Sequence, residues 1–305
     1  MTTVQTVPGK ACGVSWTGDP SFRKMGAMCG RFAADLDYSV LAEHYGARQA
    51  PGLPKPSWNI SPGSVIALVA QDRQGHRHLH PARWNLIPSW SNSDRMAYPT
   101  HNARAESALT KRTYADSARS CRAIIPASGY YEWTRDHQPY YFQAPESPAL
   151  NIAGLYSWWR SGPGQPWLLT ATILTIEATP EAARVHDRMP LLITEADLDS
   201  WLDPGVEGRL ILPRVRQNGR QACQGLVMHP VAPLKGDGPQ LTEDIVLDTR
   251  MKPSFQAASL DVGSTDDALW ESGAARPGGN TMPGKEPRQP TVMGKSPATS
   301  RSTPA

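Results

Sequence analysis

The sequence lacks the long apolar segments that a membrane protein needs. It contains no run of 18 or more apolar residues, so we expect no transmembrane helix. In residues 1–27 the valines are scattered among Thr, Gly and Lys, and there is no apolar core of the signal-peptide type. These absences predict a cytoplasmic protein with no membrane partner.

Cysteine is scarce, which argues against a thiolate zinc site. The chain has four cysteines, and no two of them are spaced as C-x-x-C. Cys121 and Cys223 lie beside apolar, strand-like runs, where buried cysteines act as small hydrophobic residues. Cys12 lies in a polar segment, and Cys29 is discussed below. We expect neither a metal nor a cofactor.

The central part of the chain also has no excess of charge. Between Cys29 and Met251 the basic and acidic residues are equal in number, so the net charge of +3 comes from the two ends. The overall charge therefore gives no support for nucleic-acid binding, and any such site must be a local cluster of basic residues.

Composition divides the chain into three parts. Residues 1–28 and 256–305 have few large apolar residues, and such segments cannot bury enough surface to offset the entropy of ordering. We expect residues 1–28 to be a disordered extension, a propeptide or a mis-assigned start. Residues 256–305 are expected to form a disordered tail rich in Pro, Gly and Ser. Residues 29–255 then have the length of one folded domain.

Within that domain, signals for strands outnumber those for helices. Many short runs are rich in Val, Ile, Tyr, Trp and Thr, and no strict alternation of strand and helix is visible. This pattern predicts a single α+β domain with a predominantly antiparallel, bent or barrel-like sheet and a few flanking helices. The expected strands are 65–70, 122–127, 140–143, 151–159, 167–176, 190–194 and 225–231. The expected helices are 37–45, 105–120, a short one capped by Thr179 and one capped by Thr194.

The string Met-Cys-Gly-Arg-Phe at residues 28–32 resembles the start of a protein. Removal of the preceding residues would leave Cys29 with a free α-amine beside its thiol. An aldehyde can react with both groups of such a 1,2-aminothiol, which no internal cysteine offers. Two explanations fit the 28 preceding residues: translation begins at Met28, or the segment is a propeptide that is cleaved before Cys29.

Four other places carry residues suited to chemistry, although each is a weak signal by itself. They are residues 101–106, residues 129–133, Thr175 and residues 186–190. A glutamate between aromatic residues is more often an ordinary surface strand residue, His-Asp-Arg is more often a hydrogen-bonded turn, and an asparagine before a helix is usually a cap. Spacing alone does not bring these places together.

Eight short motifs occur in the order that is typical of one family. With them, the chain resembles the SOS response-associated peptidase family, the abasic-site processing proteins that crosslink to damaged single-stranded DNA. The resemblance covers residues 28–250. The motifs are Met28–Phe32, Trp58–Gly63, Arg83–Pro88, Asn102–Glu106, Arg122–Ala127, Gly129–Trp133, His186–Pro190 and His229–Val231.

The resemblance implies a set of functional residues. Cys29 matches the catalytic N-terminal cysteine, and a trio of active-site residues accompanies it. The expected partner is single-stranded DNA that contains abasic sites, bound by a monomer that associates with the nucleoid when on DNA. The resemblance also implies self-processing before Cys29. The expected trio is Asn102, Glu132 and His186, and the expected DNA-binding residues are Arg31, Arg104, Pro62, Trp84 and Thr175.

One segment departs from the family pattern. After His229–Val231 the family usually continues to a Val-Asn pair, whereas this chain has Pro233–Gly238. The departure affects the expected local strand and loop and leaves the chemistry of Cys29 unaffected.

Three other interpretations remain open at this level. Cys29, His186 and Asn102 are the residue types of a cysteine peptidase that acts on other proteins. A non-catalytic binder of single-stranded nucleic acid would not need the Cys29 thiol. The histidines at 76, 78 and 80 share one face of an expected strand and could hold a metal, although an exposed strand is the simpler interpretation.

Overall fold

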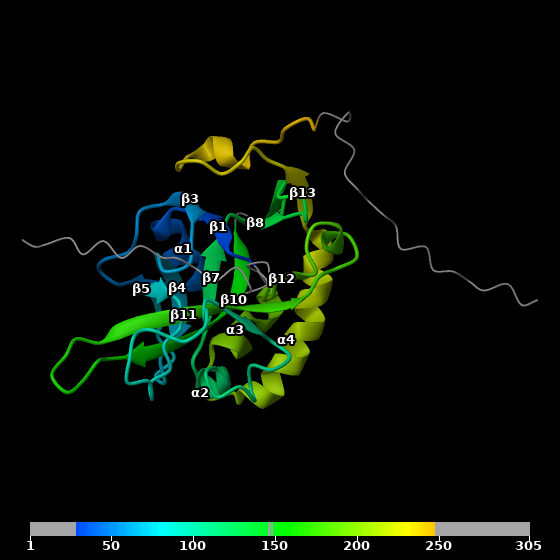
Figure 1. The fold of residues 1–305 in the computed structure, drawn as a ribbon. Coiled ribbons are helices and arrows are strands. Elements are labelled where there is room, and N and C mark those ends of the chain that lie inside the picture. Colours follow the sequence, from blue (N-terminus) through cyan, green and yellow to red (C-terminus); the bar gives the residue numbers. More distant parts are fainter. Residues whose placement is uncertain (1–28, 146, 148, 248–305) are drawn as a thin grey trace, which may run out of the picture. The chain divides into compact units, whose positions relative to one another are not determined.

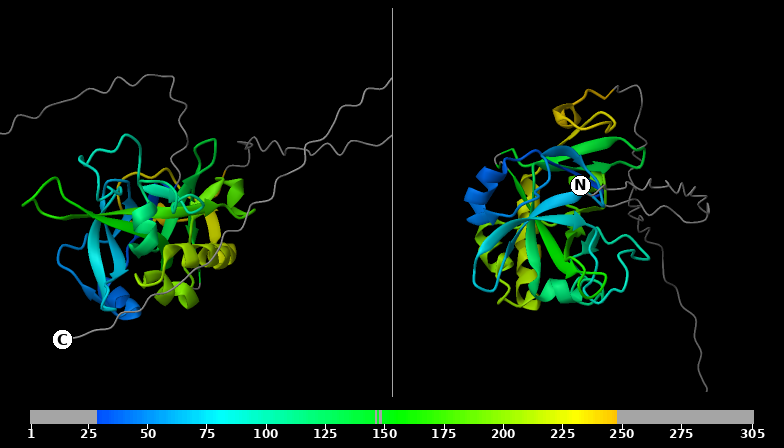
Figure 2. Two further views of the ribbon diagram at one scale, coloured as in Figure 1. Left: turned by 90° about the horizontal axis from the view of Figure 1, so that it is seen from below. Right: turned by 90° about the vertical axis from the view of Figure 1, so that its left-hand side faces the viewer.

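The computed structural model describes residues 29–145, 147 and 149–247 (Figure 1). The extension expected at residues 1–28 and the tail expected at 256–305 lie outside the described residues, as does Cys12. The described part is built from two sheets with helices along one side (Figures 1 and 2).

The larger sheet closes into a barrel of five strands. β10, β7, β4 and β5 follow one another in antiparallel pairs, β10 also pairs antiparallel with β11, and β5 completes the ring by a parallel pairing with β11. β12, β2 and β6 extend the sheet beyond the ring. The strands are β2 (Ala47–Gln49), β4 (Val65–Gln71), β5 (Arg77–Trp84), β6 (Asn102–Arg104), β7 (Arg122–Ala127), β10 (Leu150–Trp159), β11 (Leu168–Glu177) and β12 (Arg188–Pro190).

The barrel interior explains why these strands are so apolar. β7 is buried at every position, and β11 is buried from Leu169 to Ile176. Strands that lie between two packed layers read as continuous Val, Ile, Leu and Ala runs. Closure of the ring pairs both edges of the five strands and so leaves no free barrel edge.

The smaller sheet has five strands in the order β13, β9, β8, β1, β3, and all its pairings are antiparallel. Tyr130 of β8 stacks on Phe142 of β9, with ring centroids 4.7 Å apart. The strands are β1 (Arg31–Ala34), β3 (Ser57–Ile60), β8 (Gly129–Trp133), β9 (Pro139–Gln143) and β13 (Val227–Pro230). The prediction of a predominantly antiparallel, barrel-like α+β domain is therefore confirmed.

Local signals account for two of the helices. Asp37 caps α1 (Tyr38–Tyr45) by accepting a hydrogen bond from the Ser39 N–H, and Gly46 ends the helix in the left-handed conformation at φ 59°. α3 (Glu195–Leu202) follows Thr194 and buries an apolar face, as expected. The segment after Thr179 forms a short 3₁₀ turn, η1 (Ala182–Arg184), in which Thr179 Oγ1 accepts from the Ala182 N–H.

The helix expected over residues 105–120 is wrong in its first ten residues. Only α2 (Ala115–Ser120) is helical. The Ala105 N–H donates to the Thr175 carbonyl (2.9 Å), which continues the pairing of β6, and residues 107–114 form turns. Ala105 and Ala108 are buried in the core, so tertiary packing overrides a helical pattern that is weak.

Two further corrections concern the C-terminal half. The strand expected at 190–194 is β12 at Arg188–Pro190, followed by an isolated bridge between Leu192 and Ile152. α4 (Gly208–Ala222) is the longest helix among the described residues and was not predicted, because Pro213 and Gly219 interrupt its pattern. α4 packs against α2 and α3 (Figure 1). The remaining short turns are η2 (Cys223–Gly225) and η3 (Pro239–Thr242).

In the described part of the chain no helix is both long enough and apolar enough to span a membrane.

Candidate functional site

The two sheets meet at Cys29, and each contributes residues around it. Cys29 lies two residues before the start of β1, and β1 pairs with β8, which carries Glu132. Asn102 begins β6 on the edge of the larger sheet, and His186 lies between η1 and β12. Residues that are separated by long stretches of sequence thus converge because strands from both sheets end here.

Cys29 is held by contacts with two of these residues. Its backbone N–H donates to Oε1 of Glu132 at 2.5 Å, and its carbonyl accepts from Nδ2 of Asn102 at 3.3 Å. Cys29 and Glu132 are each 2% exposed. Cys29 also has a φ of 41°, which is uncommon for a residue other than glycine and persists only where the surroundings impose it. The backbone of Cys29 is therefore fixed with its nitrogen facing a carboxylate.

The electrostatics of the pair follow from burial. Removal from water raises the pKa of Glu132 to about 7, while His186 and the hydrogen bonds from Cys29 oppose that rise. Burial also raises the pKa of the Cys29 thiol, and the nearby Glu132 carboxylate raises it further. Glu132 therefore titrates near neutral pH, whereas ionisation of the thiol is disfavoured.

His186 lies within electrostatic range of Glu132 and is mostly buried, with 18% of its side chain exposed. Its Nδ1 accepts from the Arg188 N–H at 3.1 Å and lies 3.2 Å from Oδ1 of Asp187. The Arg188 N–H favours the tautomer with a proton on Nε2, whereas the Arg188 carbonyl, 3.3 Å from Nδ1, favours the other. The Asp187 carboxylate would favour a proton on Nδ1, but its side chain is 88% exposed, so water screens the interaction between the two groups.

Three of the expected DNA-binding residues lie at or near the surface. Arg104 ends β6 and is exposed, and Pro62 is exposed in the turn between β3 and β4. Arg31 is half-buried and donates from Nη1 to Oδ1 of Asn59 at 2.8 Å. Asn59 in turn donates to the Gly236 carbonyl at 2.6 Å. The segment that departs from the family pattern therefore closes onto β3 and supports Arg31 indirectly.

The structure places Trp84 and Thr175 in the core instead. Trp84 is fully buried, packs edge-on against Phe32 at 5.0 Å and donates from Nε1 to the His101 carbonyl. Thr175 is fully buried and accepts from Nη2 of Arg188 through both its carbonyl (2.7 Å) and its Oγ1 (3.3 Å). As placed, these two side chains position their neighbours and have no surface on which DNA could lie.

Two of the exposed tryptophans in the described part of the chain, which were not among the expected site residues, each carry an arginine over the ring. Trp90 is 40% exposed with the guanidinium of Arg112 over its ring at 4.3 Å. Trp167 is 57% exposed with Arg160 over its ring at 4.5 Å. The available signal was the position of Trp90 in the polar stretch Pro88–Ser93, because an exposed aromatic residue there has no core to fill.

In the structure a carboxylate, that of Asp72, lies beside the histidines at 76 and 78. His78 and His80 lie in β5, and the β4–β5 hairpin brings Oδ2 of Asp72 to 3.4 Å from Nδ1 of His76 and from Nε2 of His78. A search of the described residues finds no group of three or more His, Cys, Asp and Glu side chains arranged to hold a metal ion.

The cysteines of the described part are free thiols. Burial raises the pKa of Cys223 to about 12, and it raises that of the half-buried Cys121 as well. Neither is activated, which agrees with their interpretation as small core residues.

Comparison with known proteins gives a consistent set of relatives. The sequence model of the family described as SOS response associated peptidase (SRAP) matches residues 28–234. Abasic site processing protein YoqW of Bacillus subtilis (strain 168) is 34% identical over 183 residues, which cover 58% of this chain and 81% of that protein. Abasic site processing protein HMCES of Gallus gallus is 29% identical over 250 residues, covering 67% and 73% of the two chains.

A relative from a third source and a solved structure extend the comparison. Abasic site processing protein YedK of Escherichia coli (strain K12) is 28% identical over 220 residues, covering 69% of this chain and 95% of that protein. A crystal structure of a protein from Bacteroides thetaiotaomicron superposes with a TM-score of 0.63 at 18% identity, covering 72% of this chain and all of that chain. At this level of identity, the similarity to the Bacteroides protein shows a shared fold alone.

Proposed function

Because the chain belongs to the SOS response associated peptidase (SRAP) family, we propose that it processes abasic sites by forming a covalent crosslink between Cys29 and DNA. The names of its relatives support the abasic site as the substrate. The observation that carries the proposal is the 2.5 Å contact between the Cys29 nitrogen and the Glu132 carboxylate, because it provides a base for that nitrogen.

The reaction needs both nucleophiles of a Cys29 with a free amine. The ring-opened abasic site presents an aldehyde carbon, which the amine attacks with loss of one water to give an imine. The thiol then adds across the C=N bond, its sulfur bonding to carbon and its proton passing to nitrogen. The product is a five-membered thiazolidine, and proximity is built in because both groups belong to one residue.

Glu132 and His186 have complementary roles in these proton transfers. A free α-amine has a pKa of about 7.7–8.0, so it is mostly protonated at neutral pH. Glu132 lies 2.5 Å from the Cys29 nitrogen and can accept that proton and later return it. His186 is the second acid–base group, suited to protonating the sugar oxygen that leaves during ring opening and the oxygen that leaves as water.

Asn102 and the arginines bind and orient the substrate. Asn102 holds the Cys29 carbonyl and so fixes the direction of the amine without adding charge. Arg31 and Arg104 present guanidinium groups to phosphates next to the lesion. Single-stranded DNA suits the site, because an unpaired abasic nucleotide reaches a buried cysteine without the cost of opening a duplex.

We propose that the same residues also carry out self-processing. With a residue attached before Cys29, the nitrogen is an amide and is not nucleophilic. The Cys29 thiol can attack the preceding carbonyl carbon, transferring the acyl group from nitrogen to sulfur and leaving a free amine, and water then hydrolyses the thioester. We propose that Glu132 and His186 assist these steps, which would make the protein an autoproteolytic cysteine peptidase as well as a lyase-type enzyme.

A cysteine peptidase that acts on other proteins is the second candidate. Such enzymes depend on a thiolate, whose pKa is lowered by a neighbouring cation. Here burial and Glu132 raise the pKa of the Cys29 thiol. The raised thiol pKa therefore disfavours attack on a peptide in trans, whereas attack on the carbonyl that precedes Cys29 is intramolecular and is favoured by proximity.

The test is covalent capture by the full gene product. It should form a heat-stable adduct with single-stranded DNA carrying one abasic site and none with intact DNA, visible on a denaturing gel. Cys29→Ala should lose the adduct, and Cys29→Ser should give only an imine that borohydride traps. If Cys29→Ala forms the stable adduct as well as wild type, the thiazolidine mechanism is wrong.

A further inference from the structure

The side chain of Tyr130 is buried on the side of β8 that faces Cys29. Tyr130 lies two positions before Glu132, and alternate residues of a strand direct their side chains to the same face. Because Glu132 meets the backbone nitrogen of Cys29, Tyr130 is directed toward the same side of the sheet. Tyr130 is 1% exposed, and its ring stacks on Phe142 with the centroids 4.7 Å apart. The stack fixes the direction of the hydroxyl.

The groups around this hydroxyl include the reacting ones. Burial raises the pKa of Tyr130 well above its ordinary value. The thiols of Cys29 and Cys223 and the carboxylate of Glu132 raise it further, so all three lie within electrostatic range of the hydroxyl. Tyr130 therefore keeps its proton at neutral pH and is available as a hydrogen-bond donor.

The hydroxyl of Tyr130 has no hydrogen-bond partner among the described residues. The nearby Cys223 thiol donates to the Pro190 carbonyl at 3.7 Å and so is engaged elsewhere. The next residue differs, because the Tyr131 hydroxyl, on the opposite face of β8, donates to the Trp58 carbonyl at 2.9 Å. A buried hydroxyl that lacks a partner is destabilising, and a phenylalanine at position 130 would keep the stack without it. Folding therefore gives no reason for the Tyr130 hydroxyl.

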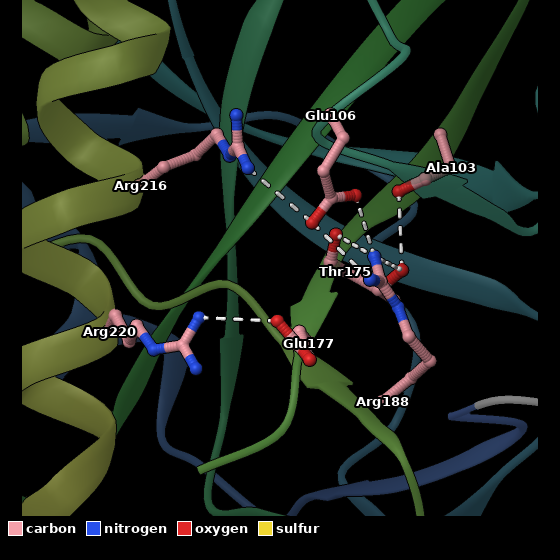
Figure 3. A network of polar contacts seen from close by, with 7 residues as sticks. All are labelled: Ala103, Glu106, Thr175, Glu177, Arg188, Arg216 and Arg220. Atoms are coloured by element: carbon pink, nitrogen blue, oxygen red, sulfur yellow. Dashed lines mark hydrogen bonds and ion pairs between the residues drawn. The ribbon is translucent and has the colours of Figure 1, made fainter. Parts of the chain in front are cut away.

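Closure of the thiazolidine ring places negative charge on the Cys29 sulfur. The thiol must lose its proton as it adds to the imine carbon, and burial raises the pKa of that thiol, whereas Arg188 lowers it. The Nη atoms of Arg188 bind the Glu106 carboxylate at 2.9 and 3.3 Å, and Nη2 also donates to the Thr175 carbonyl at 2.7 Å, as Figure 3 shows. The charge of Arg188 is therefore largely neutralised, and a donor beside the sulfur gains importance.

We propose that Tyr130 donates a hydrogen bond to the Cys29 sulfur while the thiazolidine ring closes. The inference rests on the proposed function. In this step the sulfur–carbon bond forms, the π electrons of the C=N bond pass to nitrogen, and the thiol proton reaches that nitrogen through the Glu132 carboxylate. Tyr130 keeps its own proton and stabilises the charge on sulfur until the new bond has formed. Once Cys29 is the N-terminal residue, its nitrogen is no longer held in the chain, and its side chain can turn toward Tyr130.

The experiment compares Tyr130→Phe with Tyr131→Phe in the full gene product. Each variant loses one hydroxyl from the same strand, but only Tyr130 faces Cys29. In a single-turnover reaction with single-stranded DNA carrying one abasic site, borohydride quenching traps the imine, and heating without borohydride leaves only the thiazolidine. At early times the ratio of imine to thiazolidine should rise about tenfold in Tyr130→Phe, as expected when one hydrogen bond to a charged group is lost. Tyr131→Phe should keep the wild-type ratio.

Thermal unfolding separates a role in the reaction from a role in folding. Tyr130→Phe removes a hydroxyl without a partner, so its unfolding midpoint should equal or exceed that of wild type. Tyr131→Phe breaks the bond to Trp58 and should lower the midpoint. A wild-type ratio of imine to thiazolidine in Tyr130→Phe, equal changes in both variants, or a lower midpoint in Tyr130→Phe would overturn the proposal.

Formaldehyde is a second probe, which needs no DNA. It closes the same ring on a 1,2-aminothiol, and the mass of the peptide that begins at Cys29 reports the product. Tyr130→Phe should form this ring about tenfold more slowly than wild type, and Tyr131→Phe should match wild type. If wild type forms the ring with formaldehyde and no adduct with abasic DNA, the proposed function fails, and the rates of the two variants with formaldehyde still decide the role of Tyr130. Equal rates in wild type and Tyr130→Phe would overturn that role.

Discussion

The backbone nitrogen of Cys29 and Oε1 of Glu132 are 2.5 Å apart although 103 residues separate them in the chain. β1 and β8 pair antiparallel, with Arg31 opposite Tyr131. Continuing this register brings Gly30 opposite Glu132, so Cys29, which precedes Gly30, comes close to the Glu132 carboxylate. Burial then gives the carboxyl group a pKa at which it exchanges protons near neutral pH. The contact therefore links the sheet register to the proposed chemistry.

Glu132 should make stability depend on pH. Its pKa rises from an ordinary value of 4.5 to about 7 in the folded protein, so between these pH values the folded state binds more protons than the unfolded state. Stability should then fall by about 3 kcal/mol as the pH rises through this window. Glu132→Gln should lose that dependence. Urea unfolding of both proteins at pH 4.5 and pH 8 measures it, and parallel losses in the two proteins would contradict the raised pKa.

His186 should be needed for rate more than for folding. His186→Ala should slow single-turnover crosslinking at pH 7 by about 10²-fold, the usual loss when a general acid–base group is removed. His44→Ala is the control, because that histidine lies on α1 with 44% of its side chain exposed. Unchanged rates for both His186→Ala and Glu132→Gln would locate the chemistry elsewhere.

Gly219 should be needed for the packing of α4. A Cβ at this position would lie 2.3 Å from the Leu192 carbonyl oxygen, so Gly219→Ala forces the helix away from the backbone that follows β12. The clash should outweigh the gain of about 1 kcal/mol in helix propensity and give a net destabilisation of about 2 kcal/mol. Gly225→Ala, whose Cβ would meet nothing within 4 Å, should change the midpoint of thermal unfolding little.

The N-terminus of the working protein should be Cys29. Both a start at Met28 and cleavage of a propeptide lead to this end, and only a free amine can form the imine. Intact-mass measurement of protein made from the native gene tests it. A species that retains residues 1–28 and still crosslinks abasic DNA would falsify the free-amine mechanism and leave thiol-only chemistry.

Signals that act over a few residues were readable from the sequence. Asp37 and Gly46 marked the two ends of α1, because a cap and a left-handed stop are local hydrogen-bonding devices. The apolar runs of β7 and β11 indicated buried strands. A strand that is buried on both faces is apolar along its length, and this composition can be recognised without knowing which strands it pairs with. The ordered motifs likewise named Cys29, Asn102, Glu132 and His186 as candidates.

Everything that depended on which strands pair was decided by the tertiary structure. The parallel pairing of β5 with β11 closes the barrel and buries Trp84, which the sequence analysis had placed along the DNA path. The pairing of β6 with β11 continues as a hydrogen bond from the Ala105 N–H to the Thr175 carbonyl, at the position where a helix was expected to begin.

The sequence by itself therefore determined the strand-rich class, the caps and the identity of the candidate residues, because these depend on neighbours along the chain. The distance from Cys29 to Glu132, the burial that sets the carboxyl pKa and the burial of the Tyr130 hydroxyl arise from contacts between distant segments. Such contacts depend on the register and closure of whole sheets. The free energy of each strand pairing is the sum of contributions from many residues, so no single position in the sequence specifies it.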